Sequence, residues 1–139
     1  MADERYTVDD VQLLEFGRHG DERGQLTVIE GAQSIPFEIK RLFYVYGVDG
    51  EAVRGKHANR RSAFVMVAVA GSCRICVKDP WGGEREFTLE RPQSGLYIPP
   101  MLWKDMYGFR SGSVLLVLSN EHYDADEYIQ DFEVFRAHS

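Results

Sequence analysis

Short runs of β-branched and aromatic residues recur along this chain of 139 residues, with turn-forming residues between them. This alternation of strands and tight turns is typical of an antiparallel sandwich or barrel. The turns contain pairs such as Asp49-Gly50 and Ser111-Gly112, which suit the backbone angles of a chain reversal. We therefore predict an all-β fold with strands at residues 26–29, 39–46, 64–69, 72–77, 86–89, 95–98 and 114–118.

The C-terminal part of the chain has a different pattern. Its apolar residues recur at three- and four-residue intervals, which is the spacing of one face of a helix: Tyr128, Ile129, Phe132 and Phe135. We predict a short amphipathic helix over residues 124–135. The length and the 44% hydrophobic content suit one compact domain covering residues 1–139.

Charge and hydropathy exclude several classes of protein. The net charge of −6 argues against nonspecific nucleic-acid binding, which favours a basic surface. No stretch has the roughly 18 apolar residues of a membrane span, and residues 1–10 do not form a leader peptide, so we expect a cytoplasmic protein. Arg outnumbers Lys by twelve to four, and the planar guanidinium binds phosphate oxygens two at a time, so a local anion site is compatible with the acidic chain.

Two cysteines form the sequence Cys73-Arg74-Ile75-Cys76, which has the spacing of a redox pair or half a zinc site. The segment is predicted to be a strand, where positions three apart point to opposite faces. No second C-x-x-C or histidine pair completes a metal site. We expect both cysteines to be structural.

His57 is the histidine that lies in a basic, glycine-containing segment, Arg54-Gly55-Lys56-His57-Ala58-Asn59-Arg60-Arg61, between a turn and an apolar strand. This position would place it at the mouth of a sandwich or barrel. A lone histidine and a group of arginines are also common on solvated loops, so the residues alone leave both interpretations open. His19, His122 and His138 have the character of surface residues.

Ordered motifs along nearly the whole chain resemble the nucleotide-sugar 3,4-ketoisomerase family of cupins, which act on dTDP-4-keto-6-deoxyglucose. The motifs are Asp21-Glu22-Arg23-Gly24, the run of residues 37–44, Arg54-Gly55-Lys56-His57-Ala58, Gly71-Ser72-Cys73-Arg74, Gly95-Leu96-Tyr97-Ile98, Trp103-Lys104-Asp105-Met106, and residues 114–119 and 123–129. The resemblance implies a cupin-like jelly-roll β-barrel with a short C-terminal helix. It also implies a nucleotide-diphosphate sugar as substrate and a homodimer that exchanges an N-terminal strand.

The resemblance assigns a role to individual residues. His57 matches the family's essential histidine, which moves a proton between C3 and C4 of the sugar through an enediol without a cofactor. Arg23, Arg54 and Arg74 match basic positions near the barrel opening that hold the nucleotide or its diphosphate. Lys40, Phe43 and Lys104 match further substrate-binding positions, and Asn59 joins His57 as a catalytic candidate.

This chain departs from the family pattern at three places. Phe43 replaces a usual tyrosine, Asn59 replaces a second histidine, and Lys104 replaces the histidine of a Trp-His pair. Metal-binding cupins have His-x-His with a nearby acid here, whereas no acid lies between Asn59 and Lys78, so we expect no catalytic metal. The departures leave two alternatives to the ketoisomerase: a related keto-sugar nucleotide epimerase, and a cupin that binds a nucleotide sugar without turnover.

Overall fold

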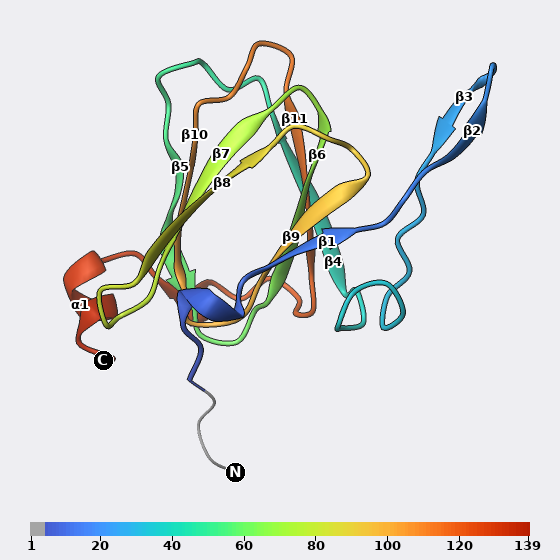
Figure 1. The fold of residues 1–139 in the computed structure, drawn as a ribbon. Coiled ribbons are helices and arrows are strands. Elements are labelled where there is room, and N and C mark those ends of the chain that lie inside the picture. The colour runs from blue at the N-terminus through green and yellow to red at the C-terminus, as the bar shows by residue number, and fades with distance from the viewer. Residues whose placement is uncertain (1–4) are drawn as a thin grey trace.

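Two five-stranded antiparallel sheets lie face to face in the computed structural model, which describes residues 5–139 (Figure 1). The first sheet has the order β1 (Gln12–Glu15), β9 (Ser94–Ile98), β6 (Phe64–Ala70), β11 (Val114–Ser119) and β4 (Arg41–Tyr46). The second sheet has the order β12 (Tyr128–Ile129), β5 (Arg54–Asn59), β10 (Trp103–Tyr107), β7 (Cys73–Lys78) and β8 (Glu84–Leu89).

The main hydrophobic core fills the space between the sheets. Side chains alternate along a strand, so one face of strands β4 and β6 to β11 supplies apolar residues to this core. Phe64, Leu96 and Val117 come from the first sheet, and Ile75 and Leu89 from the second. At the β4, β5 and β12 edges the same space is lined in part by polar side chains, and the candidate site lies there.

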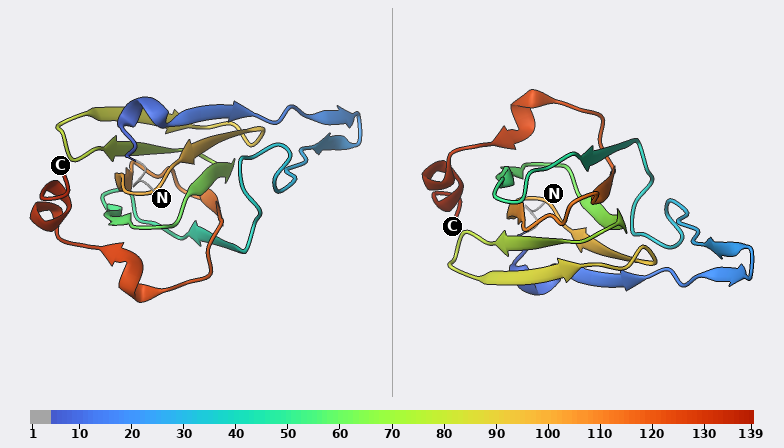
Figure 2. Two further views of the ribbon diagram at one scale, coloured as in Figure 1. Left: turned by 90° about the horizontal axis from the view of Figure 1, so that it is seen from below. Right: turned by 90° about the horizontal axis from the view of Figure 1, so that it is seen from above.

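Shorter elements surround the sheets. A two-stranded hairpin of β2 (His19–Asp21) and β3 (Gly24–Leu26) projects away from the body (Figure 1). The 3-10 helix η1 (Val8–Asp10) precedes β1, and η2 (Ala125–Glu127) precedes β12. Helix α1 (Phe132–Arg136) lies at the side of the molecule opposite this hairpin (Figure 2). Among residues 5–139, no helix is long and apolar enough to cross a bilayer.

The predicted all-β, cupin-like fold with a short C-terminal helix is confirmed, although the sheets form a sandwich and do not close into a continuous barrel. The strand predicted at residues 26–29 is wrong, because β3 ends at Leu26. The continuous helix predicted over residues 124–135 is also wrong. This segment is divided into η2, β12 and the five-residue α1, because its apolar side chains pack against β5 and β10 instead of forming one helical face.

The two cysteines are free and buried, as expected for structural residues. Cys73 belongs to the core between the sheets, whereas Cys76 lines a groove on the outer face of the second sheet. Burial raises the pKa of each thiol to about 11, which keeps the thiolate form scarce at neutral pH.

Candidate active site

His57 lies on β5 and faces the space between the two sheets. The strand changes direction just before it, because Gly55 and Lys56 have φ angles of 85° and 58°. A Cβ atom on Gly55 would lie 2.8 Å from the carbonyl oxygen of Lys104, so glycine permits the close approach of β5 to β10. The imidazole packs against the ring of Tyr128 on β12, with 4.9 Å between the ring centroids. The backbone and Tyr128 together hold the imidazole toward the interior.

A cavity of about 370 Å³ opens in front of His57. Its first wall comes from the first sheet and is apolar, and its second wall comes from β5, β10 and β12 and carries the polar groups. The lining residues are Phe43, Val45, Phe64, Met66 and Val117 on the first wall, with Val53, Arg54, Gly55, His57, Lys104, Met106 and Tyr128 on the second. The cavity therefore places an imidazole and an amine opposite an apolar surface, an arrangement that suits a ligand with one polar and one apolar face.

The imidazole of His57 is neutral at neutral pH. Burial lowers the pKa of His57 to about 4, and the Lys104 charge acts in the same direction. The hydrogen bond with the Gly55 backbone and the Glu127 charge oppose this shift but do not outweigh it. A neutral imidazole has a free lone pair, so His57 can accept a proton from a bound ligand.

Lys104 is a buried amine in the same cavity. It is 1% exposed, and it lies opposite His57 in the antiparallel pairing of β10 with β5. Its Nζ donates to Asn59 Oδ1 and to the carbonyl oxygen of Leu102, each at 3.2 Å, and lies 5.0 Å from the centroid of the Phe64 ring. Burial lowers the pKa of Lys104 to about 7, with the Glu127 charge acting in the opposite direction.

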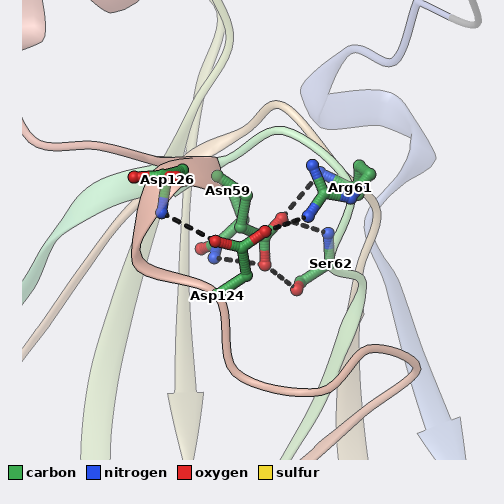
Figure 3. A network of polar contacts seen from close by, with 6 residues as sticks. Asn59, Arg61, Ser62, Asp124 and Asp126 are labelled. Atoms are coloured by element: carbon green, nitrogen blue, oxygen red, sulfur yellow. Dashed lines mark hydrogen bonds and ion pairs between the residues drawn. The ribbon is translucent and has the colours of Figure 1, made fainter.

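Behind Lys104, Asn59 and Glu127 form a buried polar network. Figure 3 labels Asn59 together with Arg61 and Ser62, which also take part in this network. Asn59 Nδ2 donates to Glu127 Oε2 at 3.2 Å, and the backbone N–H groups of Arg61 and Ser62 donate to Oε1 at 2.8 Å each. The Ser62 hydroxyl donates to Oε2 as well. Burial by itself would raise the pKa of the Glu127 carboxyl, but the hydrogen bonds from Ser62 and Arg61 outweigh it and hold the pKa below its usual value.

Asn59, a catalytic candidate, lies behind Lys104 and is fully buried. Phe43 does line the cavity, with its ring edge-on to Phe64, and Tyr44 points the other way toward Tyr46. The structure therefore brings His57, Lys104 and Phe43 to the cavity, while Asn59 contacts it through Lys104.

The four predicted basic residues other than Lys104 divide into two groups. Arg54 lines the cavity. Lys40 is exposed just before β4, and Arg74 is exposed on β7, where its guanidinium lies 5.5 Å from the Tyr107 ring centroid. Arg23 is paired with Asp21 on the projecting hairpin, with 2.7 Å between Nη2 and Oδ2. In a single chain, Lys40, Arg74 and Arg23 are therefore not among the residues that line the cavity.

Sequence reasoning missed Arg41, which follows Lys40 in one of the quoted motifs. Its Nη1 lies 3.4 Å from the Tyr128 hydroxyl, while Nε and Nη2 are buried and have no hydrogen-bond partner among residues 5–139. The guanidinium lies 5.5 Å from the centroid of the Phe43 ring and 5.7 Å from that of the exposed Tyr123. Buried donors without a partner are costly, so this guanidinium has unused capacity for an anionic ligand.

Sequence reasoning also missed the network behind the amine. Glu127 stands in the quoted motif of residues 123–129, but nothing local marks it as buried. Within residues 5–139, no three His, Cys, Asp or Glu side chains are placed together to hold a metal ion. The polar groups that line the cavity with His57 are instead the Lys104 amine, the Arg54 guanidinium and the Tyr128 phenol.

Two facing antiparallel sheets with a polar cavity between them define the cupin-like class of β fold. The chain belongs to the family described as FdtA: WxcM-like, C-terminal, whose model matches residues 9–139. It is 38% identical over 125 residues to the TDP-4-oxo-6-deoxy-alpha-D-glucose-3,4-oxoisomerase of Aneurinibacillus thermoaerophilus. The match covers 90% of this chain and 89% of the relative.

Solved structures of similar enzymes have the same fold. The sugar 3,4-ketoisomerase QdtA of Thermoanaerobacterium thermosaccharolyticum, solved with TDP, matches with a TM-score of 0.91 and 38% identity over 94% of this chain and 95% of that one. A mutant of QdtA, solved with TDP-4-keto-6-deoxyglucose, matches with a TM-score of 0.90 and 38% identity over 93% of each chain.

Proposed function

We propose that this protein is a nucleotide-sugar 3,4-ketoisomerase that acts on a TDP-4-keto-6-deoxyhexose in deoxysugar biosynthesis. The observation that carries the proposal is a neutral imidazole, His57, facing a cavity in a chain that resembles 3,4-ketoisomerases over nearly its full length. The bound TDP and TDP-sugar in QdtA support a nucleotide sugar as the ligand of this cavity.

In the proposed reaction, His57 takes the proton from C3 of the 4-keto sugar and later returns it to C4. The intermediate is an enediol, so electrons move only within the sugar and the step needs no redox cofactor. We propose that it also needs no metal, because an amine, a guanidinium and a phenol line the cavity with the single imidazole, and together they are a poor ligand set for a divalent ion. Neutral His57 has the protonation state that the first step requires.

Substrate binding divides between the two walls of the cavity. Phe43 and Phe64 offer an apolar surface to the 6-deoxy face of the sugar, whereas Arg54 and the unused donors of Arg41 suit the diphosphate. Arg23, Lys40 and Arg74 remain predicted substrate contacts that lie away from the cavity of one chain. Asn59 acts through Lys104 in this proposal, because it is buried behind that amine.

We also propose a homodimer with strand exchange, as the family resemblance implies. The projecting hairpin of β2 and β3 and the exposed residues Leu42, Tyr44 and Tyr46 on edge strand β4 support this assembly. A partner chain would cover these apolar groups and pair the free edge. The cytoplasmic location remains a prediction.

Solvent exchange at the ring carbons tests the chemistry. Wild-type protein incubated with TDP-4-keto-6-deoxyglucose in D₂O is expected to incorporate deuterium and to form the 3-keto isomer, both followed by NMR. His57→Asn should abolish exchange and leave the Kd for the nucleotide sugar nearly unchanged, because the imidazole supplies acid/base catalysis worth about 10² to 10⁴ in rate. His122→Asn, on an exposed loop, is the matched control.

The outcomes separate the alternatives. Binding without exchange by the wild type would identify a nucleotide-sugar-binding cupin, and exchange with an epimer as product would identify an epimerase. Full exchange activity in His57→Asn would show that His57 is not the proton carrier.

A further inference from the structure

The Lys104 amine has two fixed acceptors in the cavity wall. Its Nζ donates to Asn59 Oδ1 and to the Leu102 carbonyl oxygen, and it lies against the Phe64 ring. An ammonium has three hydrogens, and a neutral amine has two hydrogens and a lone pair. Both forms can keep the same two hydrogen bonds, so protonation changes only the third position, which is an N–H in one form and a lone pair in the other.

Glu127 determines which end of the Asn59 amide faces the amine. An ionised carboxylate only accepts hydrogen bonds, so the Asn59 NH₂ group points to Glu127 and Oδ1 points to Lys104. The carboxylate is held in turn by Ser62 and by two backbone N–H groups. Asn59 therefore presents a fixed acceptor to Lys104 in both protonation states.

We propose that Lys104 is a second catalytic residue, which carries a proton between the two sugar oxygens. In this proposal, which rests on the proposed function, Asn59 and Glu127 are the positioning residues of Lys104. His57 takes the proton from C3, the C–H electron pair forms the C3=C4 bond, and the C4 carbonyl oxygen receives a proton from the Lys104 ammonium. The resulting enediol then gives its C3 hydroxyl proton to the Lys104 amine as the C3 carbonyl forms. C4 receives the proton from His57, and the electrons of the C3=C4 double bond form the new C4–H bond. Both side chains then return to their starting states.

The groups around Lys104 suit an amine that changes its protonation state in each turnover. The charge of Glu127 on η2 acts on Lys104, and the charge of Lys104 acts in turn on His57 on β5. The facing strand β6 presents the uncharged Phe64 and Met66. Arg54 and Tyr128 line the same cavity. The pKa of Lys104, lowered to about 7 by burial, makes both of its forms available near neutral pH.

The first test compares Lys104→Met with Lys78→Met, a control on the outer face of the same sheet, where Lys78 lies over the Phe132 ring. Lys104→Met should lower the rates of isomerisation and C3 exchange by about 10² to 10⁴ and should remove the limb of the kcat/KM profile that titrates near pH 7. The control should keep the wild-type rates and pH profile.

The second test measures the amine directly and needs no substrate. The chain has four lysines, so NMR titration of ¹³C,¹⁵N-lysine-labelled protein resolves Lys104, which is assigned by its loss in Lys104→Met. Glu127→Gln removes the negative charge and offers an NH₂ group to Asn59, so the Asn59 amide should turn and present its own NH₂ to Lys104. The Lys104 titration should then move to lower pH, and the corresponding limb of the kcat/KM profile should move with it.

These experiments distinguish two kinds of failure. A wild-type protein that binds the nucleotide sugar but neither exchanges nor isomerises it would overturn the proposed function and the catalytic role together. Normal wild-type exchange with unchanged rates in Lys104→Met would overturn only the role of Lys104. An unchanged Lys104 titration in folded Glu127→Gln would overturn the positioning role of Glu127.

Discussion

Lys104 on β10 lies directly opposite His57 on β5, and both side chains line one cavity. The pairing places a buried amine beside a neutral imidazole, and the charge of the amine helps keep that imidazole unprotonated. The backbone allows this approach because Gly55 has no Cβ to contact Lys104. A two-group proton-transfer site therefore depends on one cross-strand pair.

Burial of Lys104 should make the stability of the protein depend on pH. Its pKa is about 7 in the folded state and ordinary in the unfolded state, so between pH 7 and 10 the unfolded chain binds more protons and stability rises with pH. From pH 7 to 8.5 the gain should be roughly 1–2 kcal/mol in the free energy of unfolding. Lys104→Met should lack this gain in urea denaturation, and parallel profiles for the two proteins would contradict the prediction.

Gly55→Ala should destabilise the protein more than Gly112→Ala. Both glycines have positive φ, 85° and 81°, but a Cβ on Gly55 would meet Lys104 and Met106 at 2.8 and 2.9 Å, whereas Gly112 has open space. We expect about 1–2 kcal/mol of backbone strain for each change and a further steric cost for Gly55. Thermal unfolding measures the difference, and equal losses would show that β5 adjusts freely.

Arg54→Ala should weaken nucleotide-sugar binding more than Arg74→Ala. Arg54 lines the cavity, while Arg74 lies on the outer face of the second sheet beside Tyr107. Loss of a hydrogen bond to a charged phosphate costs about 1.5–3 kcal/mol, or roughly 10- to 100-fold in Kd. Calorimetry with TDP measures the Kd of both variants. An equal loss of affinity in Arg74→Ala would mean that the phosphates bind outside this cavity, or that Arg74 of a partner chain contacts them.

Arg41→Met should also weaken TDP binding, because two of its buried nitrogens have no hydrogen-bond partner in the described part of the chain. The methionine side chain keeps apolar contact with Phe43 and Tyr123 while it removes the charge. We expect a rise of about 10-fold or more in Kd, in the range for charged hydrogen bonds, with little loss of stability. Arg136→Met on helix α1 is the control, and unchanged affinity in Arg41→Met would mean that the guanidinium only packs against the aromatic rings.

The outer face of the first sheet should carry the dimer contact. Tyr44 and Tyr46 are 58% and 69% exposed on edge strand β4, and replacing both with Glu should prevent a partner from covering this edge. Light scattering at micromolar concentration should give a dimer mass for the wild type and a monomer mass for the double variant. Trp81→Glu, exposed on the β7–β8 turn, should remain dimeric, and a monomeric wild type would contradict the assembly.

The all-β class of fold could be predicted from local sequence patterns. Apolar strands such as β6 and β11 are visible in local alternation, because their inward side chains must be hydrophobic to fill the core. The motif around His57 left two positions open, a solvated loop and the mouth of the fold, and the resemblance to the ketoisomerase family favoured the mouth.

Only the packing of the two sheets brings the groups of the site together. Strands β5 and β10 escaped prediction because His57, Asn59 and Lys104 face inward, which hides the alternation that marks a strand. The Lys104–Asn59 and Asn59–Glu127 hydrogen bonds join residues 45 and 68 positions apart, and no local pattern encodes such pairs. Burial then tunes their proton affinities, because the charged form of Lys104 loses water only when both sheets close over it.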